Sequence, residues 1–225
     1  MLELRALTLG GIIVRITISM VVGGIIGVER GIKNRPAGIK TYVLVSLGAC
    51  VVMMVNQYTY QVYGTGDPVR MGAQVVSGIG FLGAGTIIVT THNQIKGLTT
   101  AAGLWASACI GLATGIGLYE ITLTAGAAVF TVLAFLQGLD SSLRSRGRVV
   151  EMYIELDRGS SLGNFLRSAR ARDFDLSNVQ KEPVTADEEG VTAFTVTVRG
   201  KRNVSHEEIV QSIRSFEGVR YLESL

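Results

Sequence analysis

Few side chains in this sequence could take part in chemistry, and most of them gather at the ends of long apolar segments. Glu29 and Arg30 close the first apolar segment, and Lys96 precedes the fourth. Further cations and threonines fall at the same level, so the pattern predicts a polar pocket at one membrane surface. The residues of this predicted inner pocket are Glu29, Arg30, Arg35, Lys40, Thr41, Thr86, Lys96, Thr99 and Thr100. The alternative interpretation is that these residues only anchor helix ends at the interface.

The small number of carboxylates argues against a magnesium path built from side chains. Magnesium is held by oxygen ligands, usually carboxylates. Apart from Glu3, residues 1–140 contain four acids, all at the ends of apolar segments: Glu29, Asp67, Glu120 and Asp140. The chain also has only two histidines, His92 and His206, and no visible nucleophile–base pair. We therefore expect no enzyme, no cofactor and no resident metal, although a cation path formed by backbone carbonyls of a broken helix stays open.

The elements that must position these residues fall into two parts. Of the 225 residues, 17% are charged, against about 25% in an average soluble domain. Residues 1–140 carry 13 charged side chains and residues 141–225 carry 26, which together make the 21 basic and 18 acidic residues of the chain. This split excludes a single soluble domain. It predicts a membrane domain over 1–140 and a cytoplasmic domain over 141–225.

The membrane domain is expected to hold five transmembrane helices. A helix needs about 20 apolar residues to cross a bilayer, and suitable segments are 9–28, 41–60, 71–90, 97–118 and 121–139. With the N-terminus outside, Arg5 and Arg70 lie outside, and all other interfacial cations lie inside, namely Arg30, Lys33, Arg35, Lys40, Lys96, Arg144, Arg146 and Arg148. The positive-inside rule favours this orientation. Arg15, two turns from the outer end, is expected to extend toward the interface.

Glycines in these segments predict close helix packing or a face for a partner. The predicted glycine face comprises Gly23, Gly27, Gly78, Gly80, Gly83, Gly85, Gly111 and Gly115, with Trp105 packed against it. The segment Gly78–Gly83 formally matches a dinucleotide-binding pattern, but no strand precedes it and the next acid is Glu120, so we reject that interpretation. The third helix is equally open to close packing and to being broken or lining a cavity. Cys50 and Cys109 are expected to be buried thiols.

The second part alternates in the order strand, helix, strand, strand, helix, strand. Val150 to Leu156 has strand periodicity, and Ser205 with Glu208 forms a capping box before a helix that Gly218 ends. The helix after Ser160 and Ser161, the strands near 176–184 and 194–198, and a last strand over 219–222 complete the series. This order predicts an α+β ferredoxin-like domain, which looks like an ACT domain.

The chain resembles the MgtC/SapB family of bacterial inner-membrane proteins. The resemblance is carried by stretches spread along residues 20–118: Gly27-Val-Glu-Arg30, Arg35-Pro-Ala-Gly-Ile-Lys-Thr41 leading into Leu44-Val-Ser-Leu-Gly-Ala49, Asp67-Pro-Val-Arg70, Gln74 to Ile88, and Lys96 to Ala108. It implies an accessory protein for growth in low magnesium and, in pathogens, for survival inside macrophages. Virulence-linked members tend to carry Asn and Cys where this chain has Thr99 and Ala106, which puts a virulence role in doubt.

Three functions follow from these observations. The leading hypothesis, from the resemblance, is a regulator that binds other membrane proteins, such as ATP synthase or cation-pumping P-type ATPases, and forms a homodimer. The rival is a transporter or channel for Mg²⁺ or another cation that uses the glycine-rich third helix. The weakest treats residues 141–225 as a metabolite sensor. No basic surface suggests nucleic acid.

Overall fold

The computed structural model describes residues 7–64, 67–90, 94–136, 149–182, 190–200 and 204–224. The chain divides into two compact units, one with helices α2 to η1 and one with strands β3 to β6. The predicted basic segment at 144–148 lies outside the described residues, as do Glu3, Arg5, His92 and Asp140.

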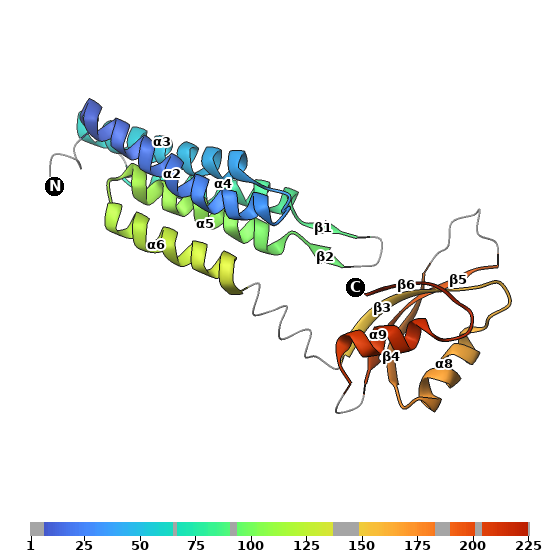
Figure 1. Ribbon diagram of the computed structural model, residues 1–225. Helices are drawn as coiled ribbons and strands as arrows, with labels where there is room; N and C mark the ends of the chain where they lie inside the picture. Colours follow the sequence, from blue (N-terminus) through green and yellow to red (C-terminus); the bar gives the residue numbers. More distant parts are fainter. Residues whose placement is uncertain are drawn as a thin grey trace. The chain divides into compact units, whose positions relative to one another are not determined.

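The first unit is a bundle of helices (Figure 1). Its helices are α2 (Leu9–Ile32), α3 (Ile39–Tyr63), α4 (Arg70–Gly85), α5 (Leu98–Gly115) and α6 (Tyr119–Thr131), which continues as the π-helical segment η1 (Val132–Leu136). Within the described residues, four segments are long and apolar enough to cross a membrane: Leu9–Ile32, Ile39–Tyr63, Leu98–Gly115 and Tyr119–Leu136. These agree with four of the five predicted spans.

The helix in the predicted third span ends earlier than expected. We predicted a helix over 71–90, but α4 stops at Gly85, and β1 (Ile88–Val89) then pairs antiparallel with β2 (Ile95–Lys96). The Thr86 hydroxyl donates to the Gly83 carbonyl over 2.8 Å and closes the last turn. Glycine is a poor helix former, so the glycine-rich end of α4 is only weakly helical. The β-branched residues from Ile87 onward favour a strand, and the helix therefore ends at Gly85. Up to that point α4 is a continuous helix and is not broken.

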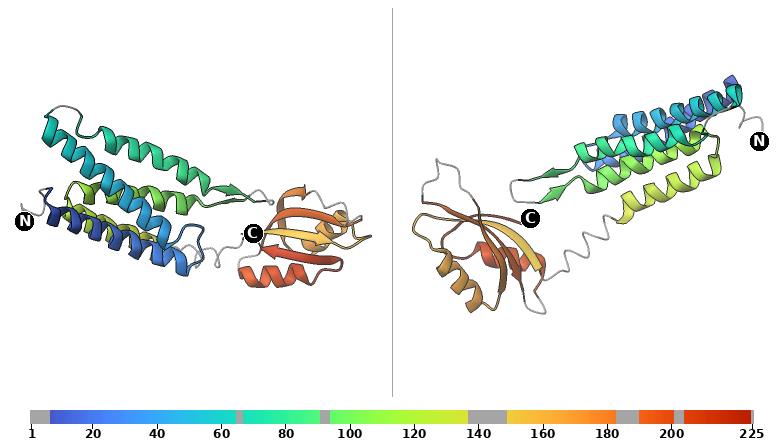
Figure 2. Two further views of the ribbon diagram at one scale, coloured as in Figure 1. Left: turned by 90° about the horizontal axis from the view of Figure 1, so that it is seen from above. Right: turned by 180° about the vertical axis from the view of Figure 1, so that it is seen from behind.

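Contacts between helices fix their directions. A Cβ atom placed on Gly27 would lie 2.6 Å from Ile39 Cα, and one placed on Gly23 would lie 2.9 Å from the Tyr42 carbonyl, so α2 and α3 are antiparallel. In contrast, α3 and α5 are parallel, because Gly103 faces Tyr42 at one end and Gly115 faces Cys50 further along. The segment between α3 and α5 must therefore return along the length of the bundle. Helix α4 and its hairpin make that return (Figure 2).

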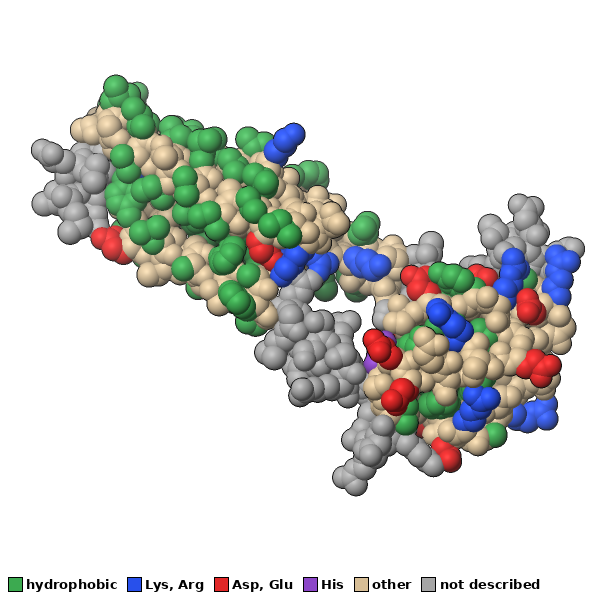
Figure 3. Space-filling view, viewed as in Figure 1, with side chains coloured by type: hydrophobic (Ala, Val, Ile, Leu, Met, Phe, Trp, Pro, Cys, Tyr) green, Lys and Arg blue, Asp and Glu red, His purple; other side chains and the backbone are tan. Residues whose placement is uncertain are grey.

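The outside of the bundle is apolar (Figure 3). Large hydrophobic side chains such as Leu44, Phe81 and Phe135 are exposed along α3, α4 and η1. A protein in water rarely exposes so much contiguous apolar surface. The exposed face is the one that lipid would cover.

The second unit is a four-stranded antiparallel sheet with two helices on one face (Figure 2). Its elements are β3 (Val149–Leu156), α8 (Leu162–Ala171), β4 (Asp175–Glu182), β5 (Thr192–Arg199), α9 (His206–Arg214) and β6 (Val219–Ser224). The strand order is β4-β5-β3-β6. The predicted alternation of strands and helices is thus found in the predicted order.

The sequence periodicities place the core of this unit as expected. Met152 and Ile154 of β3 are buried against Phe165 of α8 and Ile209 of α9. The predicted capping box of Ser205 and Glu208 is present, and Ser161 caps α8. One detail differs, because α9 ends at Arg214 rather than at Gly218. Gly218 has a φ of +84° and forms the turn into β6 instead.

Candidate functional site

Two buried charges lie together at the end of α2. Glu29 is 8% exposed and Arg30 only 1%. The Arg30 Nε donates to Glu29 Oε2, and Lys33 Nζ lies 2.8 Å from Glu29 Oε1. One carboxylate is therefore paired with two cations inside a helix bundle. We call Glu29, Arg30 and Lys33 the inner ion cluster.

The inner ion cluster joins α2 to the π-helical segment η1. Arg30 Nη2 donates to the Leu133 carbonyl over 2.7 Å, and Lys33 Nζ donates to the Ala134 carbonyl over 3.0 Å. The two side chains thus donate to backbone carbonyls of η1 and hold this segment against α2.

Most other residues predicted for the inner pocket do not join this cluster. Glu29 pairs with Arg30 and with Lys33, which lies outside the predicted set. Thr100 is buried, and its carbonyl accepts from Tyr42 Oη over 3.5 Å. Thr41 and Thr86 are half-buried, and the exposed side chains are those of Arg35, Lys40, Lys96 and Thr99. The structure therefore brings Glu29 and Arg30 together and leaves the exposed cations apart.

The sequence reasoning did not assign Lys33 or Tyr42 to the site. Lys33 follows Glu29 by four residues, a spacing that places opposite charges side by side on a helix and could have identified it. Tyr42 has no comparable signal. It is fully buried because Gly23, Gly27 and Gly103 leave room for its ring and backbone.

Arg15 is buried inside the bundle, which corrects the expectation that it extends to the interface. Its side chain is 0% exposed. Nη1 donates to Gln57 Oε1 and to the Gly115 carbonyl, each over 2.7 Å. Gly115 is the last residue of α5, so the guanidinium caps the carbonyl end of that helix, where a positive charge is stabilising. Because Gln57 and Gly115 supply acceptors within the bundle, Arg15 does not need to extend to the interface.

Hydroxyl groups connect the helices between the two buried arginines. Ser19 Oγ lies 2.9 Å from Ser46 Oγ, and Ser107 Oγ donates to the Tyr42 carbonyl over 3.4 Å. A further contact joins Thr114 and Thr122 over 3.1 Å between α5 and α6. Because these buried groups bond to one another, the interior holds its polar atoms in fixed pairs.

The predicted glycine face separates into two sets. Gly23, Gly27, Gly111 and Gly115 lie against the backbone of α3, and in each case an added Cβ would meet main-chain atoms. A Cβ atom added to Gly83 would lie 3.5 Å from Ala101 Cβ, which is an ordinary van der Waals distance. Gly78, Gly80 and Gly85, by contrast, have nothing within 4 Å of an added Cβ. Among the described residues nothing packs closely against these three, and their role as a face for a partner stays a prediction.

Trp105 lies partly on the outside of the helix bundle. It is 48% exposed, while its neighbour Leu104 is 1% exposed. The packing of Trp105 against a glycine face, within the bundle or with a partner, stays a prediction. An α-helix turns by about 100° per residue, so adjacent residues face different surroundings, and here Leu104 takes the inward position.

In the described residues, no group of three or more His, Cys, Asp or Glu side chains could hold a metal ion. Cys50 and Cys109 are free thiols, buried and half-buried. The open face of the sheet in the second unit carries acidic residues beside tyrosines: Tyr153 donates to Glu155 over 3.0 Å, and Tyr221 to Glu223 over 3.3 Å. The negative charge of Glu223, with Glu155 nearby, raises the pKa of Tyr221. This face is an electronegative surface without a ligand cradle.

Apolar helices followed by a small α/β unit define a multi-pass membrane protein with a sheet-containing domain after it. The buried Glu29–Arg30 pair and the glycine contacts of α2 lie in the part of the chain that shows its family. This chain belongs to the MgtC family, whose pattern matches residues 16–142. The resemblance noted in the sequence is thereby confirmed.

Relatives match either most of the chain or about half of it. Protein SapB of Bacillus subtilis is 30% identical over 92% of this chain and 92% of its own length. The putative magnesium transporter YhiD of Escherichia coli K12 is 29% identical over 92% of this chain and 95% of its own length. Protein MgtC of Brucella abortus is 41% identical over 54% of this chain and 49% of its own length. No solved structure matches the chain.

Proposed function

We propose that this chain is a membrane accessory protein that supports growth in low magnesium by binding other membrane proteins, such as ATP synthase or cation-pumping ATPases. The names of its relatives support a connection with magnesium, since they include MgtC and a putative magnesium transporter. The observation that carries the proposal is the pair of buried guanidinium groups, Arg15 and Arg30, on one face of α2.

These two arginines oppose a cation path through the interior between α2, α3 and α5. Both side chains are at most 1% exposed, and each donates to a backbone carbonyl, Gly115 or Leu133. Like charges repel strongly where water is excluded. A divalent cation on this route would pass the Arg15 guanidinium and an inner ion cluster of two cations with one carboxylate, and would find those carbonyls already occupied. The arrangement favours a rigid scaffold over a conduit.

The exposed glycines of α4 support a partner-binding role. Glycine inside a helix costs about 0.5–1 kcal/mol relative to alanine, and Gly78, Gly80 and Gly85 meet no neighbour within the chain that would require it. Phe81 between them is 83% exposed. At about 100° per residue, Gly78 and Gly85 lie on one side of Phe81 around the helix and Gly80 lies on the other. Small residues beside a large aromatic side chain suit close approach of another transmembrane helix. We assign this α4 face, with Trp105 of α5, to the partner.

The proposal includes five membrane crossings with the N-terminus outside. Helix α4 has 16 residues and is about 24 Å long, less than the roughly 30 Å hydrocarbon core. Because α3 and α5 run parallel, the segment joining them must still cross. Arg30, Lys33, Arg35, Lys40 and Lys96 fall at one end of the bundle, which supports a cytoplasmic location for that end and for the second unit. In a bacterium this is the inner membrane.

For the second unit we propose a ferredoxin-like, ACT-like domain that forms a homodimer. The order β4-β5-β3-β6, with α8 and α9 on one face, supports this assignment. Thr99 and Ala106 differ from virulence-linked members, so no virulence role is included.

The test joins growth, partner capture and flux. A strain lacking this protein should grow poorly in low magnesium and recover with the wild-type chain. The Gly80→Leu variant should fold and yet fail to restore growth or to retain membrane partners in a pull-down. Its control is Phe135→Leu, another exposed apolar position, which should behave as wild type. Equal recovery of partners by Gly80→Leu and wild type would refute the α4 face.

The alternative function is a transporter or channel for Mg²⁺ or another cation. The name of the Escherichia coli relative favours it, as does the glycine-rich α4. Purified protein in liposomes should show no magnesium flux above empty vesicles if the accessory role is right. Flux that is lost on Glu29→Ala would instead establish transport.

A further inference from the structure

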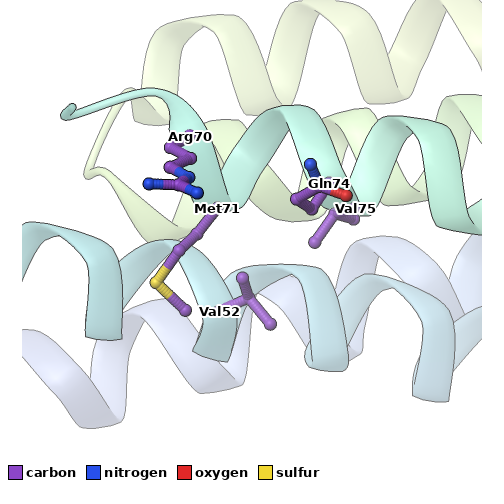
Figure 4. A pocket seen from close by; sticks show the side chains of 5 residues that line it. All are labelled: Val52, Arg70, Met71, Gln74 and Val75. Carbon is purple, nitrogen blue, oxygen red and sulfur yellow. The ribbon is translucent and has the colours of Figure 1, made fainter.

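A groove of about 420 Å³ lies on the side of the bundle between α3 and α4 (Figure 4). Val52 of α3 and Met71 and Val75 of α4 form its apolar wall, and Met71 reaches across toward Val52. Arg70 and Gln74 supply its polar atoms from the α4 side. The groove is therefore apolar along its length and carries one cation at its end.

The two polar residues of the groove are arranged along one helical face. Arg70 is the first residue of α4, and Gln74 follows one turn later. Both side chains are exposed, and within the described residues neither takes part in an ion pair. The Arg70 amide donates to the Asp67 carbonyl over 3.3 Å, which leaves the exposed Arg70 guanidinium as the charged group of the groove. Asp67 is the nearby acid, and its Oδ1 accepts from the Val69 amide over 2.9 Å.

Neighbouring residues place Arg70 at the level of the lipid headgroups. Tyr58, Tyr60 and Tyr63 are exposed on the last turns of α3, immediately before α4 begins. Tyrosine collects at the boundary between headgroups and hydrocarbon. The Asn56 side chain donates to the Pro68 carbonyl and holds the connecting loop at this level. The groove then leads from the headgroup level toward the hydrocarbon.

We infer that the α3–α4 groove binds one anionic phospholipid. The phosphate pairs with the Arg70 guanidinium, and one acyl chain lies along Val52, Met71 and Val75. Gln74, one turn deeper, donates to an ester carbonyl of the lipid. This contact gives the exposed amide a partner in a region where an unsatisfied polar group is costly. Binding of a membrane protein or of a second copy of the chain in this groove would displace the lipid.

The test measures lipid retention by the full chain. Protein from mixed phosphatidylglycerol and phosphatidylcholine vesicles is extracted in mild detergent, and bound lipids are counted by native mass spectrometry. The wild type should retain phosphatidylglycerol in preference to phosphatidylcholine. Arg70→Gln should lower that preference about fivefold, the effect expected of one cation near a membrane surface. Gln74→Leu should lower retention about two- to threefold.

Two further variants separate the groove from general charge effects. Lys40→Gln removes an exposed cation from the opposite end of the bundle and should leave the preference unchanged. Val75→Phe keeps Arg70 but fills the groove, and should reduce retention of both lipids. Comparable melting temperatures for all variants exclude misfolding as the cause. Full retention by Arg70→Gln, or equal losses in Lys40→Gln and Arg70→Gln, would overturn the inference.

Discussion

Helices α5 and α4 are both rich in glycine, and their glycines have opposite surroundings. Gly103, Gly111 and Gly115 of α5 lie against side chains and backbone of α3, where any side chain would collide. Gly78, Gly80 and Gly85 of α4 meet nothing within 4 Å. The same residue type therefore closes the interior on one helix and leaves an open surface on the other. The comparison locates the scaffold of the protein in α2, α3 and α5, and its available face on α4.

The most severe test of the closed side is Arg30→Ala. The change leaves Glu29 buried with Lys33 alone, and breaking a buried ion pair in this way costs about 3–5 kcal/mol. The free energy of unfolding, measured by denaturant titration in mixed micelles, should fall by that amount. The double variant Glu29→Ala/Arg30→Ala should recover part of the loss. A loss below about 1 kcal/mol for the single variant would show that the buried cluster is not part of the scaffold.

Adjacent residues of α5 test whether closed and open sides exist on one helix. Leu104→Ala removes a side chain that is 1% exposed and should cost about 2–4 kcal/mol. Trp105→Ala removes a larger side chain that is 48% exposed, and should cost less than about 1 kcal/mol. The same unfolding measurement compares the two. If Trp105→Ala is the more damaging, its placement on the open side is wrong.

The test with the smallest expected effect replaces one glycine that is packed against α3 and one glycine that faces open space by alanine. Gly111→Ala forces a methyl group against the Ser46 carbonyl and should destabilise the protein by about 1–3 kcal/mol. Gly80→Ala enters open space and should stabilise α4 by about 0.5–1 kcal/mol through helix propensity. Melting temperatures in detergent should move in opposite directions. Shifts of the same sign would remove the distinction between the helices.

Much of the fold could be predicted from the sequence because it depends on local patterns. Charge-free intervals locate the apolar helices, and alternation over Val150–Leu156 gives the first strand of the second unit. The Ser205–Glu208 capping box is likewise a local pattern that the structure confirms. Stretches such as Lys96 to Ala108 carry the family resemblance, which the match over residues 16–142 confirms.

The candidate site was less predictable because it depends on which way helices face. A helix that is apolar on all sides gives no signal of its inward side. For this reason, Arg15 was expected at the interface and lies in the interior. The expected gathering of Arg35, Lys40 and Lys96 around Glu29 also depended on facing, and the structure joins Glu29 to Arg30 and Lys33 instead.

By itself the sequence determined the division into an apolar and a charged part, the elements of each part, and the family. Composition and periodicity are local properties of the sequence, and they do not depend on which segments pack together in the fold. Only the tertiary structure decided which glycines are closed, that two guanidinium groups donate to backbone carbonyls of α5 and η1, and that a groove opens between α3 and α4. These features arise where segments distant in the chain approach one another, and a contact between two surfaces is not encoded in the pattern of either one.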